Sequence, residues 1–170
     1  MIIRAEKPSD YEEVYNLIKE AFQDEEHTDH KEQDLVCKLR KSDNFIPELS
    51  LVAEKDGQIL GHILFTTILV NDETLLALAP VAVLNANKKT GIGSALINEG
   101  HKIAEQLGHK GIVVLGHEQY YPRFGYSISE KYGITPHFDV PKENFMVKEL
   151  YKDALLGING VVVYAKEFLD

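Results

Sequence analysis

Two apolar segments, LSLVAEK (residues 49–55) and QILGHILFTTILV (58–70), are separated only by the pair Asp56–Gly57. This pair suits a two-residue hairpin turn, because both central positions of such a turn favour positive φ. The segments are therefore predicted to form adjacent antiparallel strands. A second turn at Asn71–Asp72 leads into TLLALAPVAVL (74–84), so a three-stranded antiparallel meander is predicted in the middle of the chain.

The apolar pattern then becomes helical, and a helix is predicted over residues 91–107, ending at Gly108. One face of this helix carries Ile92, Leu96, Ile103 and Leu107. The segment GIVVL (111–115) has the pattern of a buried strand. A strand, a helix and a strand in this order require a crossover connection, so strands 74–84 and 111–115 are predicted to be parallel neighbours.

The N-terminal residues IIRA (2–5) are predicted to form a short strand, and PSDYEEVYNLIKEAF (8–22) a helix. Ser9 and Glu12 have the spacing of a capping box at the start of this helix. Its buried stripe is predicted to consist of Val14, Leu17, Ile18 and Ala21.

A second, shorter helix is predicted to end near Lys41. Its apolar positions are Leu35, Val36 and Leu39. Further along, FMVKEL (145–150) and GVVVYA (160–165) have the pattern of a final pair of strands. No internal repeat or interdomain linker is visible, so a single α+β domain spanning residues 1–170 is expected.

The balance of charged residues limits the partners that the chain is expected to bind. It contains 18 Lys and Arg against 27 Asp and Glu, which gives a formal net charge of -9. Binding to a nucleic-acid backbone requires clustered Lys and Arg, so no nucleic-acid partner is expected. The surplus of acid favours a cationic partner, or simply keeps the protein soluble.

The apolar stretches and the cysteine content bear on location. TLLALAPVAVL is the nearest candidate for a membrane span, and it is shorter than the roughly 18 apolar residues that cross a bilayer, so no membrane association is expected. The single cysteine, Cys37, excludes an internal disulfide and is expected to be a small buried residue. The first residues lack the pattern of a secretory signal, so a cytoplasmic location is expected.

The segment NANKKTGIGSALI has an unusual charge pattern for a helix start. Between residues 74 and 98 the only charged side chains are Lys88 and Lys89. Acidic residues normally collect in the first turn of a helix, where free N–H groups and the macrodipole make a positive end. An external anion would complete this arrangement, because Gly91 and Gly93 let a ligand approach the backbone. A phosphate or pyrophosphate site is therefore predicted at this helix start.

Two common phosphate-binding motifs do not fit this segment. The loop of nucleotide triphosphatases requires GxxxxGK followed by Ser or Thr, and that spacing is absent. A dinucleotide fingerprint requires GxGxxG close behind a strand, whereas GIGSAL lacks the third glycine and follows a loop of about seven residues. Redox chemistry with a nicotinamide or flavin dinucleotide is thus disfavoured, although it stays an alternative hypothesis.

The segment VAVLNANKKTGIGSALI resembles the acetyl-coenzyme A signature of the GNAT superfamily of N-acetyltransferases, in which a strand precedes Gln or Arg, two residues, Gly, any residue, and Gly or Ala. Gly91 and Gly93 match this signature, and Lys88 stands where Gln or Arg is usual. Residues 2–22 are similar to the first strand and helix of the superfamily, and YYPRFGY to its late tyrosine motif. GHEQYYPRFGY together with GVVVYA most resembles a bacterial YhbS-type subgroup.

This resemblance implies the GNAT fold, a mixed and mostly antiparallel sheet of about six to seven strands with helices on both faces. A splayed parallel strand pair would hold acetyl-CoA, which is expected as a co-substrate, with no metal. The backbone of one strand would pair with the pantetheine arm, and the loop and helix start would hold the pyrophosphate. The implied cofactor-binding residues are Val81, Ala82, Val83, Lys88, Lys89, Thr90, Gly91, Ile92, Gly93 and Ser94.

The resemblance also provides candidates for proton transfer. Tyr121 matches the tyrosine that commonly serves as general acid in this superfamily. Pro122 biases Tyr121 away from helical angles, so Tyr120 stays an alternative for the hydroxyl. His117 and Glu118 follow the strand end and are candidates for the general base, beside a surface or structural role.

The acidic segment DEEHTDH lies where the acceptor site often lies in this superfamily. Glu25, Glu26 and Asp29 are therefore candidates to attract a cationic amine, and a solvated acidic loop is the alternative. His27 and His30 are not expected to bind a metal, because one helical turn rarely supplies a full ligand set.

Together these features predict an N-acetyltransferase that moves an acetyl group from acetyl-CoA to a primary amine by direct attack in a ternary complex. The expected acceptor is small and cationic, and a homodimer is an open alternative to a monomer. A non-catalytic acyl-CoA-binding sensor is the alternative function, since it would keep the phosphate site without the acceptor chemistry.

Overall fold

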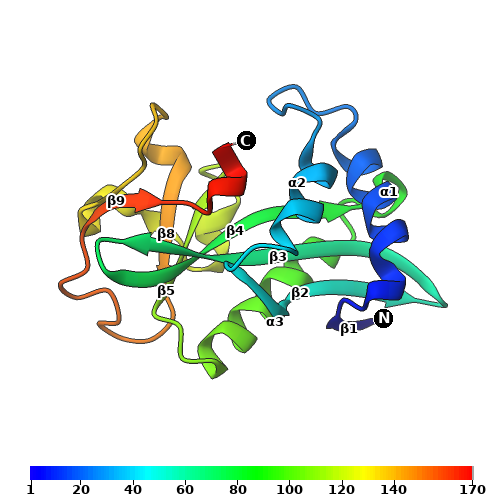
Figure 1. Ribbon diagram of the computed structural model, residues 1–170, viewed down its shortest axis with the longest axis horizontal. Helices are drawn as coiled ribbons and strands as arrows, with labels where there is room; N and C mark the ends of the chain where they lie inside the picture. The colour runs from blue at the N-terminus through cyan, green and yellow to red at the C-terminus, as the bar shows by residue number, and fades with distance from the viewer. Residues whose placement is uncertain (170) are drawn as a thin grey trace.

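The computed structural model describes residues 1–169, which form nine strands, three α-helices and several 3-10 turns (Figure 1). The strands are β1 (Ile2–Ala5), β2 (Phe45–Lys55), β3 (Gln58–Val70), β4 (Glu73–Val83), β5 (Gly111–Leu115), β6 (Ser127–Ile128), β7 (Ile134–Thr135), β8 (Phe145–Glu149) and β9 (Gly160–Val163). The helices are α1 (Tyr11–Phe22), α2 (Glu32–Leu39) and α3 (Ile92–Gln106). The 3-10 turns are η1 (Pro8–Asp10), η2 (Asn85–Asn87), η3 (Tyr121–Phe124), η4 (Ser129–Tyr132), η5 (Lys142–Asn144) and η6 (Lys166–Leu169). Within this part of the chain, no helix is both long and apolar enough to cross a bilayer.

The sheet is mixed and mostly antiparallel, with the strand order β1-β2-β3-β4-β5-β8-β6. The predicted meander of β2, β3 and β4 is confirmed, and its first turn has positive φ at both Asp56 (52°) and Gly57 (79°). Strands β8 and β9 do not form the predicted final pair: β8 pairs with β5 and β6, whereas β9 pairs with β3 and β7. The short strands β6 and β7 bring the sheet to nine strands, above the expected number.

Strands β4 and β5 are parallel neighbours, as predicted, but they pair only at Leu76–Ile112 and Ala77–Val113. Beyond Ala77, β4 has a register shift against β3 and stays paired with β3 as far as Val83. Strand β5 instead continues along β8 as far as Leu115. The two strands therefore separate toward their carboxyl ends, and beyond Ala77 and Val113 their facing edges are not paired with each other. This separation confirms the splayed pair.

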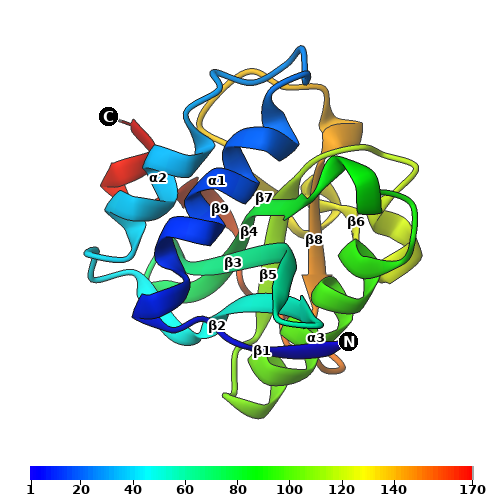
Figure 2. The same ribbon diagram turned by 90° about the vertical axis from the view of Figure 1, so that its right-hand side faces the viewer.

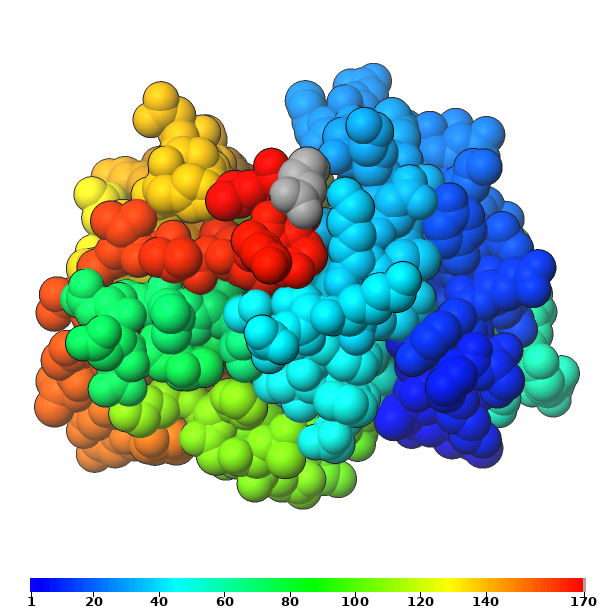
Figure 3. Space-filling model, in the orientation of Figure 1, coloured from blue at the N-terminus to red at the C-terminus, as the bar shows by residue number. Residues whose placement is uncertain are grey.

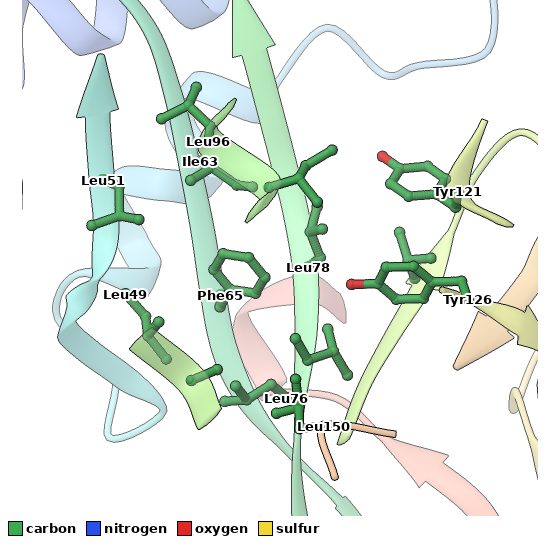
Figure 4. Packing of buried hydrophobic residues seen from close by; sticks show 14 of the residues in the cluster. Leu49, Leu51, Ile63, Phe65, Leu76, Leu78, Leu96, Tyr121, Tyr126 and Leu150 are labelled. Carbon is green, nitrogen blue, oxygen red and sulfur yellow. The ribbon is translucent and has the colours of Figure 1, made fainter. Parts of the chain in front are cut away.

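The helices cover opposite faces of the sheet: in Figures 1 and 2, α1 and α2 lie above it and α3 lies below it. This arrangement follows from the alternation of side chains along each strand. Leu51, Ile63 and Phe65 face α3 (Figure 4), and their neighbours Val52 and Leu64 face α1 and α2.

The predicted stripe of α1 is confirmed, since all four of its residues are buried. The capping box of Ser9 and Glu12 is wrong, because the turn η1 precedes the helix. Asp10 instead accepts a hydrogen bond from the Lys7 N–H at 2.8 Å and pairs with Arg4 at 2.7 Å.

The predicted apolar face of α3 is only partly right. Leu107 follows the last helical residue and is 45% exposed, because it lies beyond the turn that packs on the sheet. The face that packs on the sheet consists of Ile92, Leu96, Ile97, Gly100, His101 and Ala104. Gly108 has a φ of 87° and ends the helix, as predicted. The second helix, α2, ends at Leu39, slightly before the predicted end.

Candidate active site

The N-terminus of α3 is open to an anion. Gly91 is its N-cap, with a φ of 91°, and no side chain among residues 1–169 caps this end by a hydrogen bond. The first turn contains no acidic residue, so no carboxylate within it offsets its free N–H groups and the positive end of the macrodipole. A helix start of this kind is suited to bind phosphate.

A groove of about 740 Å³ connects this helix start to the gap between β4 and β5. Eight of the ten predicted cofactor residues line it: Val81, Ala82, Val83, Lys88, Lys89, Gly91, Gly93 and Ser94. The other two do not line it: Ile92 is buried in the core, and Thr90 is exposed, with its hydroxyl donating a hydrogen bond to the Asn87 carbonyl oxygen. The chain therefore brings together the strand edge and the loop that the sequence singled out.

Lys88 lines this groove, but its ammonium group is directed at the end of α1. It donates a hydrogen bond of 3.0 Å to the Ala21 carbonyl oxygen and lies 3.9 Å from the Glu25 carboxylate. The C-terminus of a helix carries partial negative charge, so this position suits a cation. Lys88 thus joins one wall of the groove to the other.

Tyr121 lies on the β5 side of the gap, and its hydroxyl end is directed toward the strand that carries Leu78 (Figure 4). Its ring covers Gly116, where an added Cβ would come within 2.3 Å of the ring, so a larger residue at this position would displace the tyrosine. Burial, and secondarily the neighbouring Tyr120, raises the pKa of Tyr121 well above its ordinary value. The hydroxyl is protonated near neutral pH, as an ordinary tyrosine also is, and is able to donate a hydrogen bond.

The hydroxyl of Tyr120 lies at the other end of the groove. It is 3.3 Å from the position that a Cβ on Gly93 would occupy, beside the first turn of α3. The N–H groups of Tyr120 and Tyr121 both donate to the His117 carbonyl oxygen, at 3.1 and 3.3 Å. This turn fixes the two rings in a T-shaped pair and directs their hydroxyls to different parts of the groove.

The two candidate bases differ in position. His117 is exposed and lines the groove, whereas Glu118 is exposed and does not line it. Of the three acids considered for the acceptor, only Glu25 lines the groove; Glu26 is exposed elsewhere, and Asp29 accepts a hydrogen bond from the Lys31 N–H at 2.9 Å. Among residues 1–169, no group of three or more His, Cys, Asp or Glu side chains is arranged to hold a metal ion.

Several residues of this site were missed in the sequence. Arg123 and Phe22 line the groove, and Arg123 also lies 5.2 Å from the centre of the Tyr120 ring. Arg123 could have been found from the sequence, since it belongs to the quoted motif YYPRFGY. Asn144, which supports the site through hydrogen bonds of 2.9 and 3.0 Å with Gly116, could not have been found, because it is 28 residues away in the sequence.

Comparison with known proteins agrees with this geometry. Residues 11–126 match the model of the acetyltransferase (GNAT) family. The chain is 32% identical to the N-acetyltransferase YhbS of Escherichia coli K12, itself described as uncharacterized, over 99% of this chain and 98% of that protein.

Solved structures with the same fold hold the cofactor. The crystal structure of Escherichia coli YhbS in complex with CoA has a TM-score of 0.91 and 30% identity, covering 99% of this chain and 92% of that one. A GNAT acetyltransferase from Brucella melitensis in complex with acetyl-CoA has a TM-score of 0.83 and 34% identity, covering 98% and 97%. The splayed strands, the open helix start and these similarities agree, and the chain belongs to the GNAT family of acetyltransferases.

Proposed function

We propose that this protein transfers an acetyl group from acetyl-CoA to a primary amine, by direct attack of the amine within a ternary complex. The observation that carries the proposal is the groove that joins the open N-terminus of α3 to the gap between β4 and β5. A pyrophosphate and an extended arm need these two features side by side. The CoA and acetyl-CoA complexes of the two relatives above support the same donor.

In this proposal the N–H groups from Gly91 to Ser94 hold the pyrophosphate, and Lys89 adds charge at the loop. The pantetheine arm lies along the free edge of β4 at Val81–Val83 and pairs with its backbone as an added strand would. Because the arm starts at α3 and follows β4 toward Ala77, its thioester end reaches the narrow part of the gap.

The reaction requires the alkyl ammonium to lose two protons in all and the departing sulfur to gain one, so one proton is released to solvent. An alkyl ammonium has an ordinary pKa near that of lysine, so a base or water must first remove a proton from it. The neutral amine nitrogen then bonds to the thioester carbon and loses its second proton, the C–S bond breaks, and the thiolate takes a proton. Backbone N–H groups of Val81–Val83 are the candidates to stabilise the oxyanion.

Tyr121 is the better supported of the two candidate acids. Its hydroxyl is directed across the gap toward β4. The Tyr120 hydroxyl lies beside Gly93, at the phosphate end of the groove, where it is better placed to donate to the cofactor. His117 is the better supported base, acting through water, because it lines the groove and Glu118 does not.

The proposal is tested by incubating the protein with acetyl-CoA and a panel of amines, measuring both free thiol and acetylated product. Thiol release matched by acetylated amine is the expected result. Stabilisation by CoA without any acetylated amine would instead favour the acyl-CoA sensor. Stabilisation by a nicotinamide dinucleotide but not by CoA would overturn the assignment of the donor site.

A further inference from the structure

A second cavity, of about 390 Å³, lies at the same gap between β4 and β5. It is bounded by Ala79 of β4 and Leu115 of β5. The groove proposed above to hold acetyl-CoA, called the donor groove below, is lined by Val81, two residues beyond Ala79, and by Gly116, which follows Leu115. Leu115 is two residues beyond Val113, so it faces the side of the sheet opposite α3. The two cavities therefore approach the narrow part of the gap from adjoining positions.

Aromatic rings form the outer wall of this second cavity. His137 and Phe138 come from the segment before β8, and Tyr164 and Phe168 come from the segment after β9. Their ring centres are 4.9 Å (His137–Phe138), 6.3 Å (Phe138–Tyr164) and 5.3 Å (Tyr164–Phe168) apart. In Figure 3 the gold segment and the red C-terminal segment that carry these rings lie next to one another at the upper edge.

The lining of this cavity carries almost no charge. Among residues 1–169, no Asp, Glu, Lys or Arg lines it, and His137 is its only basic group. The Tyr164 hydroxyl is neutral at pH 7, as tyrosine ordinarily is, and burial raises its pKa further. An apolar cavity walled by rings favours an aromatic ligand, through burial of apolar area and edge-to-face contacts.

We propose that this aromatic cavity binds the acceptor, and that the acceptor is a primary amine carrying an aromatic ring on a short alkyl chain. The inference rests on the function proposed above, in which the thioester ends at the narrow part of the gap. The aromatic ring of the acceptor packs against the wall formed by Phe138, Tyr164 and Phe168, and its amine emerges between Ala79 and Leu115. A small amine without a ring leaves these apolar surfaces uncovered.

The charges near the donor groove also favour selection of the acceptor by its apolar part. Glu25 is the only one of the three acids that lines the groove, and the Lys88 ammonium lies 3.9 Å from it. This contact offsets the negative charge that would attract an amine by charge alone. Selection among amines then depends on the aromatic cavity, where size and apolar surface are discriminated.

The test compares 2-phenylethylamine with ethylamine and spermidine as acceptors, at saturating acetyl-CoA. We expect kcat/KM for 2-phenylethylamine to exceed that for ethylamine by roughly ten-fold or more, as is usual for filling an apolar pocket. The variants His137→Ala and Phe168→Ala should reduce this ratio. Tyr151→Ala is the matched control, because Tyr151 is 48% exposed and does not line the cavity, and this variant should keep the ratio.

Equal or better use of ethylamine or spermidine would overturn this inference and leave the proposed function standing. If no amine is acetylated, a second measurement tests the aromatic cavity separately from the proposed acetyl transfer. In CoA-saturated protein, 2-phenylethylamine should shift the NMR signals of the His137 ring, and ethylamine should not. The absence of that shift would overturn the aromatic acceptor cavity, whether or not transfer occurs.

Discussion

The ammonium group of Lys88 lies 3.0 Å from the carbonyl oxygen of Ala21, so the loop before α3 is fastened to the last turn of α1. The Asn85 N–H donates to the Glu20 carboxylate at 3.1 Å and adds a second contact between the same segments. These contacts join parts of the chain that are more than sixty residues apart, as the 67-residue separation of Lys88 and Ala21 shows. Lys88 therefore shapes the donor groove, because its ammonium group holds the two segments together.

Replacing Lys88 by Gln should lower the stability of the fold and weaken the binding of CoA. The Lys88–Ala21 hydrogen bond is partly exposed, so its loss should lower the free energy of unfolding by about 1 kcal/mol or less. The Kd for CoA should rise several-fold, because the wall of the groove loosens. Thermal denaturation and calorimetric titration with CoA measure the two effects.

Lys89→Gln is the matched control for this variant. Among residues 1–169, no hydrogen bond or ion pair of the Lys89 side chain is present, so this change should weaken CoA binding without lowering stability. Lys88→Arg should restore much of the wild-type stability, since it keeps a donor and a charge. Equal stability of Lys88→Gln and Lys89→Gln would contradict the role of the Ala21 contact.

Replacing Tyr121 by Phe should lower kcat by about a hundred-fold, the usual effect of losing a positioned general acid. The ring remains over Gly116, so the fold and the Kd for acetyl-CoA should change little. Steady-state kinetics and calorimetric titration separate the two quantities.

Tyr120→Phe is the matched control, because its hydroxyl lies beside Gly93 rather than across the gap. It should raise KM for acetyl-CoA and leave kcat nearly unchanged. If Tyr120→Phe lowered kcat and Tyr121→Phe did not, the assignment of the acid would be reversed.

The elements that the sequence predicted well are those with local signals. The Asp56–Gly57 turn and the stripe of α1 depend on residues close together in the chain. The pairing of β4 with β5 follows from the rule for a strand, helix and strand in this order. The partners of β8 and β9 could not be predicted, because strand pairing over long separations is not marked by local periodicity.

The residues of the site were likewise predicted where the signal was local and missed where it was not. The glycines and missing acids of the segment before α3 pointed to a phosphate site, and the groove contains most of these residues. The aromatic cavity was not predicted, because its rings come from two segments with no regular periodicity that meet only in the folded chain. The direction of the Lys88 side chain was missed for the same reason, since Ala21 is distant in sequence.

Replacing Gly100 by Ala should destabilise the core. An added Cβ would lie 2.2 Å from Cε1 of the buried Phe65 ring, so α3 or the ring must move. Overpacking of this kind costs about 1–3 kcal/mol, which exceeds the gain in helix propensity from Gly to Ala. Urea denaturation measures the difference in the free energy of unfolding.

Asn98→Ala, on the exposed side of the same helix, is the matched control and should be neutral or slightly stabilising. A Gly100→Ala variant as stable as the wild type would show that Phe65 moves aside without cost. If Gly100→Ala is destabilising, as expected, the double variant with Phe65→Leu should be less damaging than the sum of the two single changes, because the smaller side chain removes the clash.

Two buried histidines should make the fold sensitive to acid. Burial lowers the pKa of both His62 and His101 to about 4, from an ordinary value of 6.5. Glu6 and Arg40 face His62, with opposing effects on its pKa, and Lys148 lowers the pKa of His101 further. The hydrogen-bond partners are Ser50 for His62, at 3.2 Å, and the Tyr126 hydroxyl for His101, at 2.8 Å.

The sign of the effect follows from proton binding in the two states. Between about pH 6.5 and about pH 4 the unfolded chain binds protons at these histidines and the folded chain does not, so acid favours unfolding. Each histidine contributes a loss of at most about 1.4 kcal/mol per pH unit in this window. The free energy of unfolding should be highest above pH 6.5 and fall as the pH decreases toward 4.

His101→Gln should make the free energy of unfolding, measured by urea denaturation, depend less on pH across this window. The exposed His27→Gln should leave that dependence unchanged. An unchanged slope in His101→Gln would mean that His101 is already protonated in the folded protein.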